Sequence, residues 1–207
     1  MNKKIVNMKK NKTLLWVVDC QNDFMNEDGK LYVPGSEQIK SNIHKKISEH
    51  EKNGGSIVYT QDWHYHDSEE LSINPDFVNT FPEHCMSGTY GADLIDEVKP
   101  NGYNSIINWD QKMKLTTFPK SFKILLRKDK FDFVSGNPNS SILLHSLEEE
   151  FTDIEVIGVS GNVCVNKAVI GLTKVGFHVR AIMNCIASLP NIPSCDKEWK
   201  ELGVELI

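Results

Sequence analysis

The sequence Thr13-Leu14-Leu15-Trp16-Val17-Val18-Asp19 lies near the start of the chain and decides the fold. Its apolar and β-branched residues form an unbroken run that stops at an acid, which is typical of a strand buried on both faces of a parallel sheet. The alternation of such runs with helical patterns predicts an α/β fold: a doubly wound, mostly parallel six-stranded sheet with helices on both faces. Further strands are predicted at 56–60, 123–127, 154–159, 178–183 and 204–207, and helices at 36–53, 140–150, 163–175 and 196–202.

The length and composition are those of one globular domain. With 207 residues, of which 40% are hydrophobic and 25% charged, the chain is long enough to build its own core. We expect a single domain over 1–207. Within it, residues 1–12, which include five lysines, are expected to form a flexible or peripheral N-terminal extension.

The charge and the cysteines exclude several classes of protein. A net charge of −5 gives no general attraction for nucleic acid or for an anionic membrane surface. No apolar run approaches the roughly 20 residues of a membrane span. The five cysteines are odd in number and form no C-x-x-C pair, so we expect reduced thiols in a cytoplasmic protein. No long amphipathic stripe decides the oligomeric state, which leaves a homo-oligomer open.

Polar residues with catalytic potential stand where four predicted strands end. Asp19 ends the first strand, Asp62 and His64 follow the second, Lys128 follows the third, and Cys164 comes shortly after the fourth. Taken singly, each has a structural explanation: an acid that caps a turn, a solvated lysine, or a small buried thiol. Ligands of open parallel sheets bind beyond the carboxyl ends of the strands. Because all of these residues share that edge, we interpret them as one site.

The long connection after the second predicted strand carries a candidate metal site. We expect it to contain one short helix, at 92–98, and otherwise loop, which in a compact domain is usually functional. Asp62 and His64 are separated by one residue, so on an extended segment both side chains face the same way. With His84 they form a two-histidine, one-carboxylate set suited to one divalent ion, zinc first, with iron or manganese as alternatives. His66 is a rival ligand, although we expect it at the surface.

Six motifs form a set that resembles a known family. They are Val18-Asp19-Cys20-Gln21-Asn22-Asp23-Phe24, Leu31-Tyr32-Val33-Pro34-Gly35, Thr60-Gln61-Asp62-Trp63-His64, the segment from Phe81 to Ala92, Arg127-Lys128-Asp129, and the segment from Gly158 to Val165. Together they span nearly the whole chain and resemble the isochorismatase-like cysteine hydrolases, and within these the nicotinamidases. The first and last motifs are typical of the wider family. The D-W-H motif with P-x-H-C is specific to nicotinamidases that contain a metal.

The resemblance implies a catalytic role for residues at the strand ends. Asp19, Lys128 and Cys164 correspond to a catalytic triad. The backbone N–H groups of Ser160 and Cys164 would form an oxyanion hole, beside a cis peptide bond between Val159 and Ser160. The start of the following helix and the charge of Lys128 would favour the thiolate form of the cysteine.

The resemblance also implies a metal site and an aromatic pocket. Glu70 stands where some members have a fourth metal ligand, although a solvated loop charge explains it equally well. Phe24 and Phe81 correspond to walls of the pocket that holds the substrate ring. The other metal ligands would be Asp62, His64 and His84.

The activity implied is hydrolysis of nicotinamide to nicotinate and ammonia through a thioester, in NAD salvage, with pyrazinamide as a further substrate. Two alternatives remain: a family hydrolase of another small amide or N-carbamoyl compound, and a non-catalytic binding protein on the same fold. Three departures from the family pattern bear on substrate preference. Phe81 replaces the usual Trp, the segment 128–133 replaces the usual loop, with Asp129 where Gly often follows the lysine, and Gly161-Asn162 replaces Thr-Asp.

Overall fold

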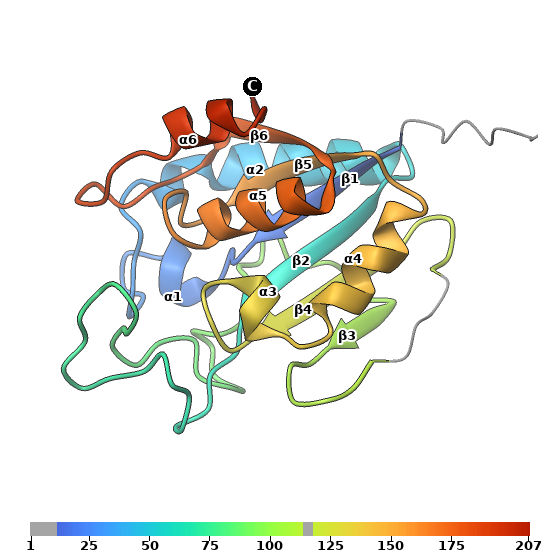
Figure 1. Cartoon of the computed structure of the whole chain (residues 1–207). Coiled ribbons are helices and arrows are strands. Elements are labelled where there is room, and N and C mark those ends of the chain that lie inside the picture. The colour runs from blue at the N-terminus through green and yellow to red at the C-terminus, as the bar shows by residue number, and fades with distance from the viewer. Residues whose placement is uncertain (1–11, 114–117) are drawn as a thin grey trace, which may run out of the picture.

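The computed structural model describes residues 12–113 and 118–207, so residues 1–11 of the predicted N-terminal extension lie outside the described residues. Its strands are β1 (Thr13–Val18), β2 (Ser56–Asp62), β3 (Ser105–Ile107), β4 (Lys123–Lys128), β5 (Asp153–Gly158), β6 (His178–Ile186) and β7 (Glu205–Leu206). They form one sheet in the order β3-β4-β2-β1-β5-β6-β7, in which neighbouring strands are parallel (Figure 1).

The helices connect these strands across the two faces of the sheet. They are α1 (Asn22–Met25), α2 (Ser36–Lys52), α3 (Phe133–Gly136), α4 (Ser140–Glu148), α5 (Cys164–Val175) and α6 (Asp196–Glu201). Over the part of the chain that the structure describes, none of them is both long and apolar enough to cross a membrane.

β1 lies in the middle of the sheet, and the later strands extend it in both directions. β1 pairs with β2 on one side and with β5 on the other. β4 and β3 continue the first half, whereas β6 and β7 continue the second (Figure 1). This arrangement confirms the predicted doubly wound fold. The reversal of direction beside β1 creates a crevice beyond the carboxyl ends of β1 and β5, where such sheets bind ligands.

Alternation along the central strand gives the sheet its two apolar faces. Leu14, Trp16 and Val18 of β1 pack into a cluster with residues of α4, α5 and α6. Leu15 and Val17 point the other way and pack with residues of α2. Helices therefore cover both faces, as the continuous apolar run of β1 predicts.

Two details of the sequence prediction are wrong. The sheet has seven strands instead of six, because the short β3 adds an edge within the long connection, where three residues leave no periodic signal. The segment 92–98 is not a helix, because its backbone pairs with the residues that follow β1. The N–H of Asn22 donates to the carbonyl oxygen of Asp93 at 2.9 Å, and the N–H of Ile95 donates to that of Cys20 at 2.9 Å. The apolar spacing of this segment reflects packing against the core.

Candidate active site

Asp19 directly follows β1 and is fully buried. Its backbone φ of 47° lies in the left-handed region that non-glycine residues rarely occupy. Thr60 of β2 holds it there, because the hydroxyl donates to Asp19 Oδ1 at 2.6 Å and accepts from the Asp19 N–H at 3.3 Å. Burial raises the pKa of Asp19, although the charge of Lys128 opposes this change. A carboxylate of this kind can accept a proton and return it.

Lys128, the last residue of β4, joins Asp19 to Asp62. Its ammonium lies 2.8 Å from Asp19 Oδ2 and also pairs with Asp62 Oδ1. Burial disfavours the ammonium, but the two carboxylates outweigh it and hold the pKa of Lys128 well above its ordinary value. Burial alone would raise the pKa of Asp62, yet Lys128 keeps that pKa below its ordinary value. Lys128 therefore connects the candidate triad to the candidate metal ligands.

Cys164 is the first residue of α5, after the turn that leaves β5. The expected cis peptide bond is present between Val159 and Ser160. Ser160 and Cys164 line the same pocket. Because N–H groups at the start of a helix have no acceptor within the helix, this turn is suited to hold a developing negative charge.

The surroundings of the Cys164 thiol oppose the formation of the expected thiolate. Burial raises its pKa well above the ordinary value, and although Lys128 acts in the opposite direction, Asp19 and Asp62 add to the increase. The sequence shows the lysine and the start of the helix, but it does not show two carboxylates packed within 4.8 Å of the sulfur. Burial and the two acids therefore favour the protonated thiol, and the carboxylate of Asp19 lies close enough to receive its proton.

Gly158, the last residue of β5, allows Asp19 and Cys164 to approach each other. It pairs with Val18, the residue before Asp19. Its φ is 122°, which residues with a side chain rarely adopt. A Cβ atom at this position would overlap the carbonyl oxygen of Val18. The missing side chain therefore lets β1 and β5 end side by side.

The structure brings Asp62, His64 and His84 together at the end of β2. Each offers a ligand atom within 4.8 Å of the other two. The Nδ1 atom of His84 is hydrogen-bonded to the carbonyl oxygen of Pro82 at 2.7 Å, which leaves Nε2 facing Asp62 Oδ2 at 3.8 Å. His66 is exposed and stands outside this cluster.

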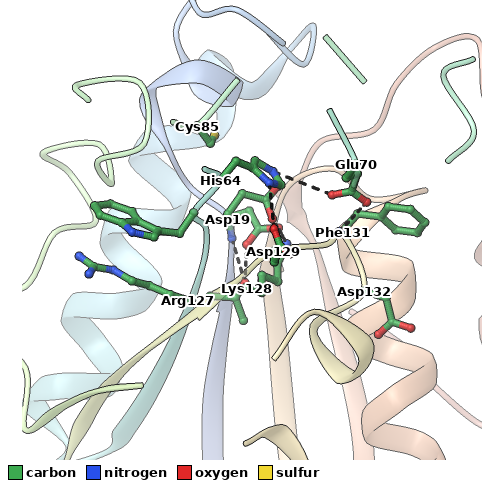
Figure 2. A network of polar contacts seen from close by, with 12 residues as sticks. Asp19, His64, Glu70, Cys85, Arg127, Lys128, Asp129, Phe131 and Asp132 are labelled. Carbon is green, nitrogen blue, oxygen red and sulfur yellow. Dashed lines mark hydrogen bonds and ion pairs between the residues drawn. The ribbon is translucent and has the colours of Figure 1, made fainter. Parts of the chain in front are cut away.

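Glu70 is buried beside His64, so the alternative of a solvated loop charge is wrong. Its Oε1 accepts a hydrogen bond from the backbone N–H of Phe131 at 2.9 Å. Its Oε2 lies 3.9 Å from Nε2 of His64 (Figure 2). Burial, together with the charge of Asp62, raises the pKa of Glu70 to about 8.

The polar atoms around His64 fit a bound cation. Both ring nitrogens of His64 and the Oε2 atom of Glu70 are buried without a hydrogen-bond partner. Buried polar atoms are almost always paired, so an unpaired ring nitrogen facing an unpaired carboxylate oxygen calls for a further partner. Zinc, iron and manganese all accept imidazole and carboxylate ligands. The donor set therefore suits a divalent metal ion.

An apolar pocket leads to Cys164 and His84. The ring of Phe24 lies 5.5 Å from that of His84, and the ring of Phe81 lies 6.2 Å from it. Phe131 packs against Phe81 at 6.2 Å and extends the aromatic wall. Such walls suit a small, flat ligand. The pocket is lined by Phe24, Leu31, Val33, Glu70, Phe81, His84, Phe131, Ser160, Val163, Cys164 and Leu189.

Two of the pocket residues, Phe131 and Leu189, escaped the sequence analysis. Phe131 belongs to the segment after the triad lysine that departs from the family pattern, and this departure is the only signal in the sequence. Leu189 is placed by Asn162, whose amide donates to the carbonyl oxygens of Leu189 and Ile192 at 2.8 Å each. The side-chain oxygen of Asn162 accepts from the Leu189 N–H at 3.1 Å and from the Ser160 hydroxyl at 2.9 Å. All four hydrogen-bonding positions of this amide are thus used.

Gln21 does not line the pocket, but it supports the candidate metal site, and the sequence analysis assigned it no role. Its side-chain nitrogen donates to the carbonyl oxygens of Asp62 and Ala92 at 2.8 Å each. Its side-chain oxygen accepts from the N–H of Asp62 at 2.8 Å. Gln21 therefore fixes the backbone of a candidate metal ligand, and only the motif around Asp19 pointed to it.

The fold and the site define the class of protein: an α/β enzyme with a buried cysteine at the carboxyl edge of its sheet. The isochorismatase domain matches residues 13–201. The chain belongs to the isochorismatase family and is a hydrolase.

Relatives and solved structures agree with this assignment. The nicotinamidase/pyrazinamidase of Mycobacterium tuberculosis is 25% identical over 196 residues, which cover 93% of this chain and 97% of that protein. The pyrazinamidase of Pyrococcus horikoshii in complex with zinc has a TM-score of 0.71 at 22% identity, covering 95% of this chain and 98% of that one. The N-carbamoylsarcosine amidase of Thermoplasma acidophilum has a TM-score of 0.68 at 22% identity, covering 94% and 95%. At these identities the two structures show the fold alone.

Proposed function

We propose that the protein is a nicotinamidase, a metal-containing cysteine amidohydrolase that converts nicotinamide and water to nicotinate and ammonia. The observation that carries the proposal is that Cys164 and His84 line the same small aromatic pocket, each backed by a buried polar cluster, and that the two clusters share Asp62. The activities named for the relatives support it. The reaction would serve NAD salvage in the cytoplasm, and pyrazinamide would be a second substrate.

The pocket would hold the pyridine ring by its faces. Phe24, Phe81 and Phe131 offer aromatic contact, and the carboxamide carbon would lie against the sulfur of Cys164. Asp62, His64, His84 and Glu70 would hold the metal. When bound, a divalent ion supplies a Lewis-acidic position for the lone pair of the ring nitrogen.

Acylation would begin with the transfer of the Cys164 proton to Asp19. The sulfur attacks the carboxamide carbon, and the negative charge that forms on oxygen is held by the backbone N–H groups of Ser160 and Cys164. Loss of one such donor costs about 3 kcal/mol of transition-state stabilisation. The carbon–nitrogen bond breaks, Asp19 gives its proton to the leaving nitrogen, and ammonia departs from a thioester.

Hydrolysis of the thioester would use the same groups in reverse order. Asp19 accepts a proton from water while the water oxygen attacks the thioester carbon. The carbon–sulfur bond breaks, and the proton on Asp19 returns to the sulfur of Cys164. The ammonium of Lys128 would favour the ionised form of Asp19 between proton transfers. It would also offset the negative charge of the Asp19 carboxylate.

Ammonia release measures this function directly. The purified protein should release ammonia from nicotinamide and pyrazinamide and should contain about one divalent ion per chain. The Cys164→Ala protein should release none while keeping its fold and metal. Release from N-carbamoyl amino acids in preference to nicotinamide, by a protein without bound metal, would support the alternative hydrolase. A wild-type protein that releases ammonia from none of these compounds would contradict an amidohydrolase function.

A further inference from the structure

His64 lies between two carboxylates, one facing each nitrogen of its ring. Nε2 is 3.9 Å from Oε2 of Glu70, and Nδ1 is 3.7 Å from Oδ1 of Asp129. The ring is fully buried, and neither nitrogen has a hydrogen-bond partner. Figure 2 shows the ring with one contact leading to Glu70 and the other to Asp129.

The two carboxylates are held differently. Oδ1 of Asp129 accepts a hydrogen bond from the hydroxyl of Ser68 at 2.7 Å, and that hydroxyl accepts one from the N–H of Tyr65 at 3.0 Å. The N–H of Asp129 donates to the carbonyl oxygen of Gly136 at 3.0 Å. Asp129 is therefore anchored at both its side chain and its backbone. In Glu70, by contrast, Oε2 is unpaired and the residue lines the pocket.

This difference distinguishes the surroundings of the two ring nitrogens of His64. Nε2 faces Glu70, which lines the pocket together with His84. Nδ1 lies on the side of the anchored Asp129. An imidazole that binds a metal through one nitrogen carries hydrogen on the other, and a carboxylate is the usual acceptor of that hydrogen.

We propose that Asp129 is the positioning residue for His64. When the metal binds, the 3.7 Å contact would shorten to a hydrogen bond that Asp129 accepts from Nδ1–H, and this would select the tautomer whose Nε2 lone pair is free for the metal. This inference rests on the proposed metal site. Glycine, which often occupies the position after the triad lysine in the family, has no side chain to accept this hydrogen bond. The selection of the His64 tautomer by Asp129 is thus specific to the loop that follows Lys128 in this chain.

Asp132 provides a matched control in the same loop. Its Oδ1 accepts from the N–H of Val134 at 2.9 Å and caps α3. An Asp132→Asn change removes one negative charge from the loop and keeps a good capping side chain. The experiment therefore compares the zinc affinities of the wild type, Asp129→Ala, Asp129→Asn and Asp132→Asn, measured by competition with a chromogenic chelator.

Loss of the acceptor should weaken zinc binding by roughly 10- to 100-fold in Asp129→Ala, the usual effect of losing such a partner. Asp129→Asn should recover most of this loss, because its amide oxygen still accepts from Nδ1–H. Asp132→Asn should bind zinc as the wild type does. NMR of the ring nitrogens of His64 in the zinc-loaded wild type should show hydrogen on Nδ1, which tests the inference even if Asp129→Ala does not fold.

Equal zinc affinity of Asp129→Ala and the wild type, or hydrogen on Nε2 of His64, would overturn the role of Asp129 and leave the metal site standing. A wild type that binds no zinc, iron or manganese would overturn both the metal site and this inference. Ammonia release plays no part in either measurement, so the nicotinamidase proposal is judged separately.

Discussion

The ammonium of Lys128 pairs with the carboxylate of Asp62, so a member of the candidate triad neutralises a candidate metal ligand. The same ammonium lies 2.8 Å from Asp19. Two buried carboxylates thus share one positive charge, and a change at any of the three residues alters the electrostatics of the others. A substitution of Lys128, the residue that both sides share, should therefore affect the nucleophile side and the metal side of the site together.

Replacement of Lys128 by Met should abolish ammonia release and also destabilise the protein. Removal of one partner from a buried ion pair leaves uncompensated charge and typically costs 3–5 kcal/mol, so we expect a loss of about 3 kcal/mol in the free energy of unfolding from urea denaturation. Lys130→Met is the control, because Lys130 pairs with the exposed Glu69 at 2.9 Å and such pairs contribute less than about 1 kcal/mol. Equal losses in both variants would contradict the central role of Lys128.

Replacement of Asp19 by Asn should abolish turnover without removing the metal. The amide keeps an acceptor for the Thr60 hydroxyl, so the fold should persist, but it cannot take the proton of Cys164. Ammonia release and metal content, measured on one preparation, test this. Substantial turnover by the variant would remove Asp19 from the proposed proton transfers.

Replacement of Phe131 by Ala should weaken binding of nicotinamide more than it slows the chemical steps. The ring forms a pocket wall and carries no group that could take part in the proposed proton transfers, so KM should rise roughly tenfold, which corresponds to about 1.4 kcal/mol of lost contact. Steady-state kinetics separates KM from kcat. Phe118→Ala is the control, since Phe118 packs against Phe122 at 4.8 Å, away from the pocket lining. An unchanged KM in Phe131→Ala would show that the ring does not contact substrate.

Replacement of Asn162 by Asp should loosen the pocket wall at Leu189. A carboxylate cannot donate to the two carbonyl oxygens that Asn162 now satisfies, and each unsatisfied buried group costs about 1–3 kcal/mol. We expect a lower melting temperature and a higher KM. Asn166→Asp is the matched control, because the side-chain oxygen of Asn166 accepts from the indole of Trp199 at 2.7 Å and an aspartate can do the same. The same melting temperature in both variants would refute the argument.

Replacement of Glu70 by Gln should reduce metal retention during dialysis, because it removes a charged donor from the proposed ligand set. Glu69→Gln tests whether any loss of loop charge has this effect, since the neighbouring Glu69 carboxylate is exposed and pairs with Lys130. Metal analysis after dialysis gives the comparison. If both variants keep as much metal as the wild type, Glu70 is not a ligand.

The sequence predicted the central strands because their signal is local. A continuous apolar run such as Leu14 to Val18 can be stable only where both faces are covered, and the polar residue after it marks the carboxyl edge of the sheet. Asp19, Asp62, Lys128 and the turn before Cys164 could thus be placed at one edge before any contact was known. Helices α2 and α5 were predicted within one residue of their observed ends for the same reason.

The remaining features depend on contacts between distant segments, which a local pattern does not record. The segment 92–98 has helical spacing, but its backbone pairs with residues that follow β1. The raised pKa of Cys164 comes first from burial and then from two acids, Asp19 and Asp62, contributed by other segments, whereas the sequence beside the cysteine shows only the start of a helix. Leu189 becomes part of the pocket through the amide of Asn162, 27 positions away in the chain.

The absence of a side chain at Gly158 limits how this protein can change over evolutionary time or in the laboratory. Even the methyl group of alanine would act as a wedge between β1 and β5 and move the cysteine turn away from Asp19. A library that randomises this codon should yield active clones with glycine alone, whereas positions in the aromatic wall should accept several residues. The position near the reaction that tolerates the fewest substitutions would then be one that offers the substrate no side chain.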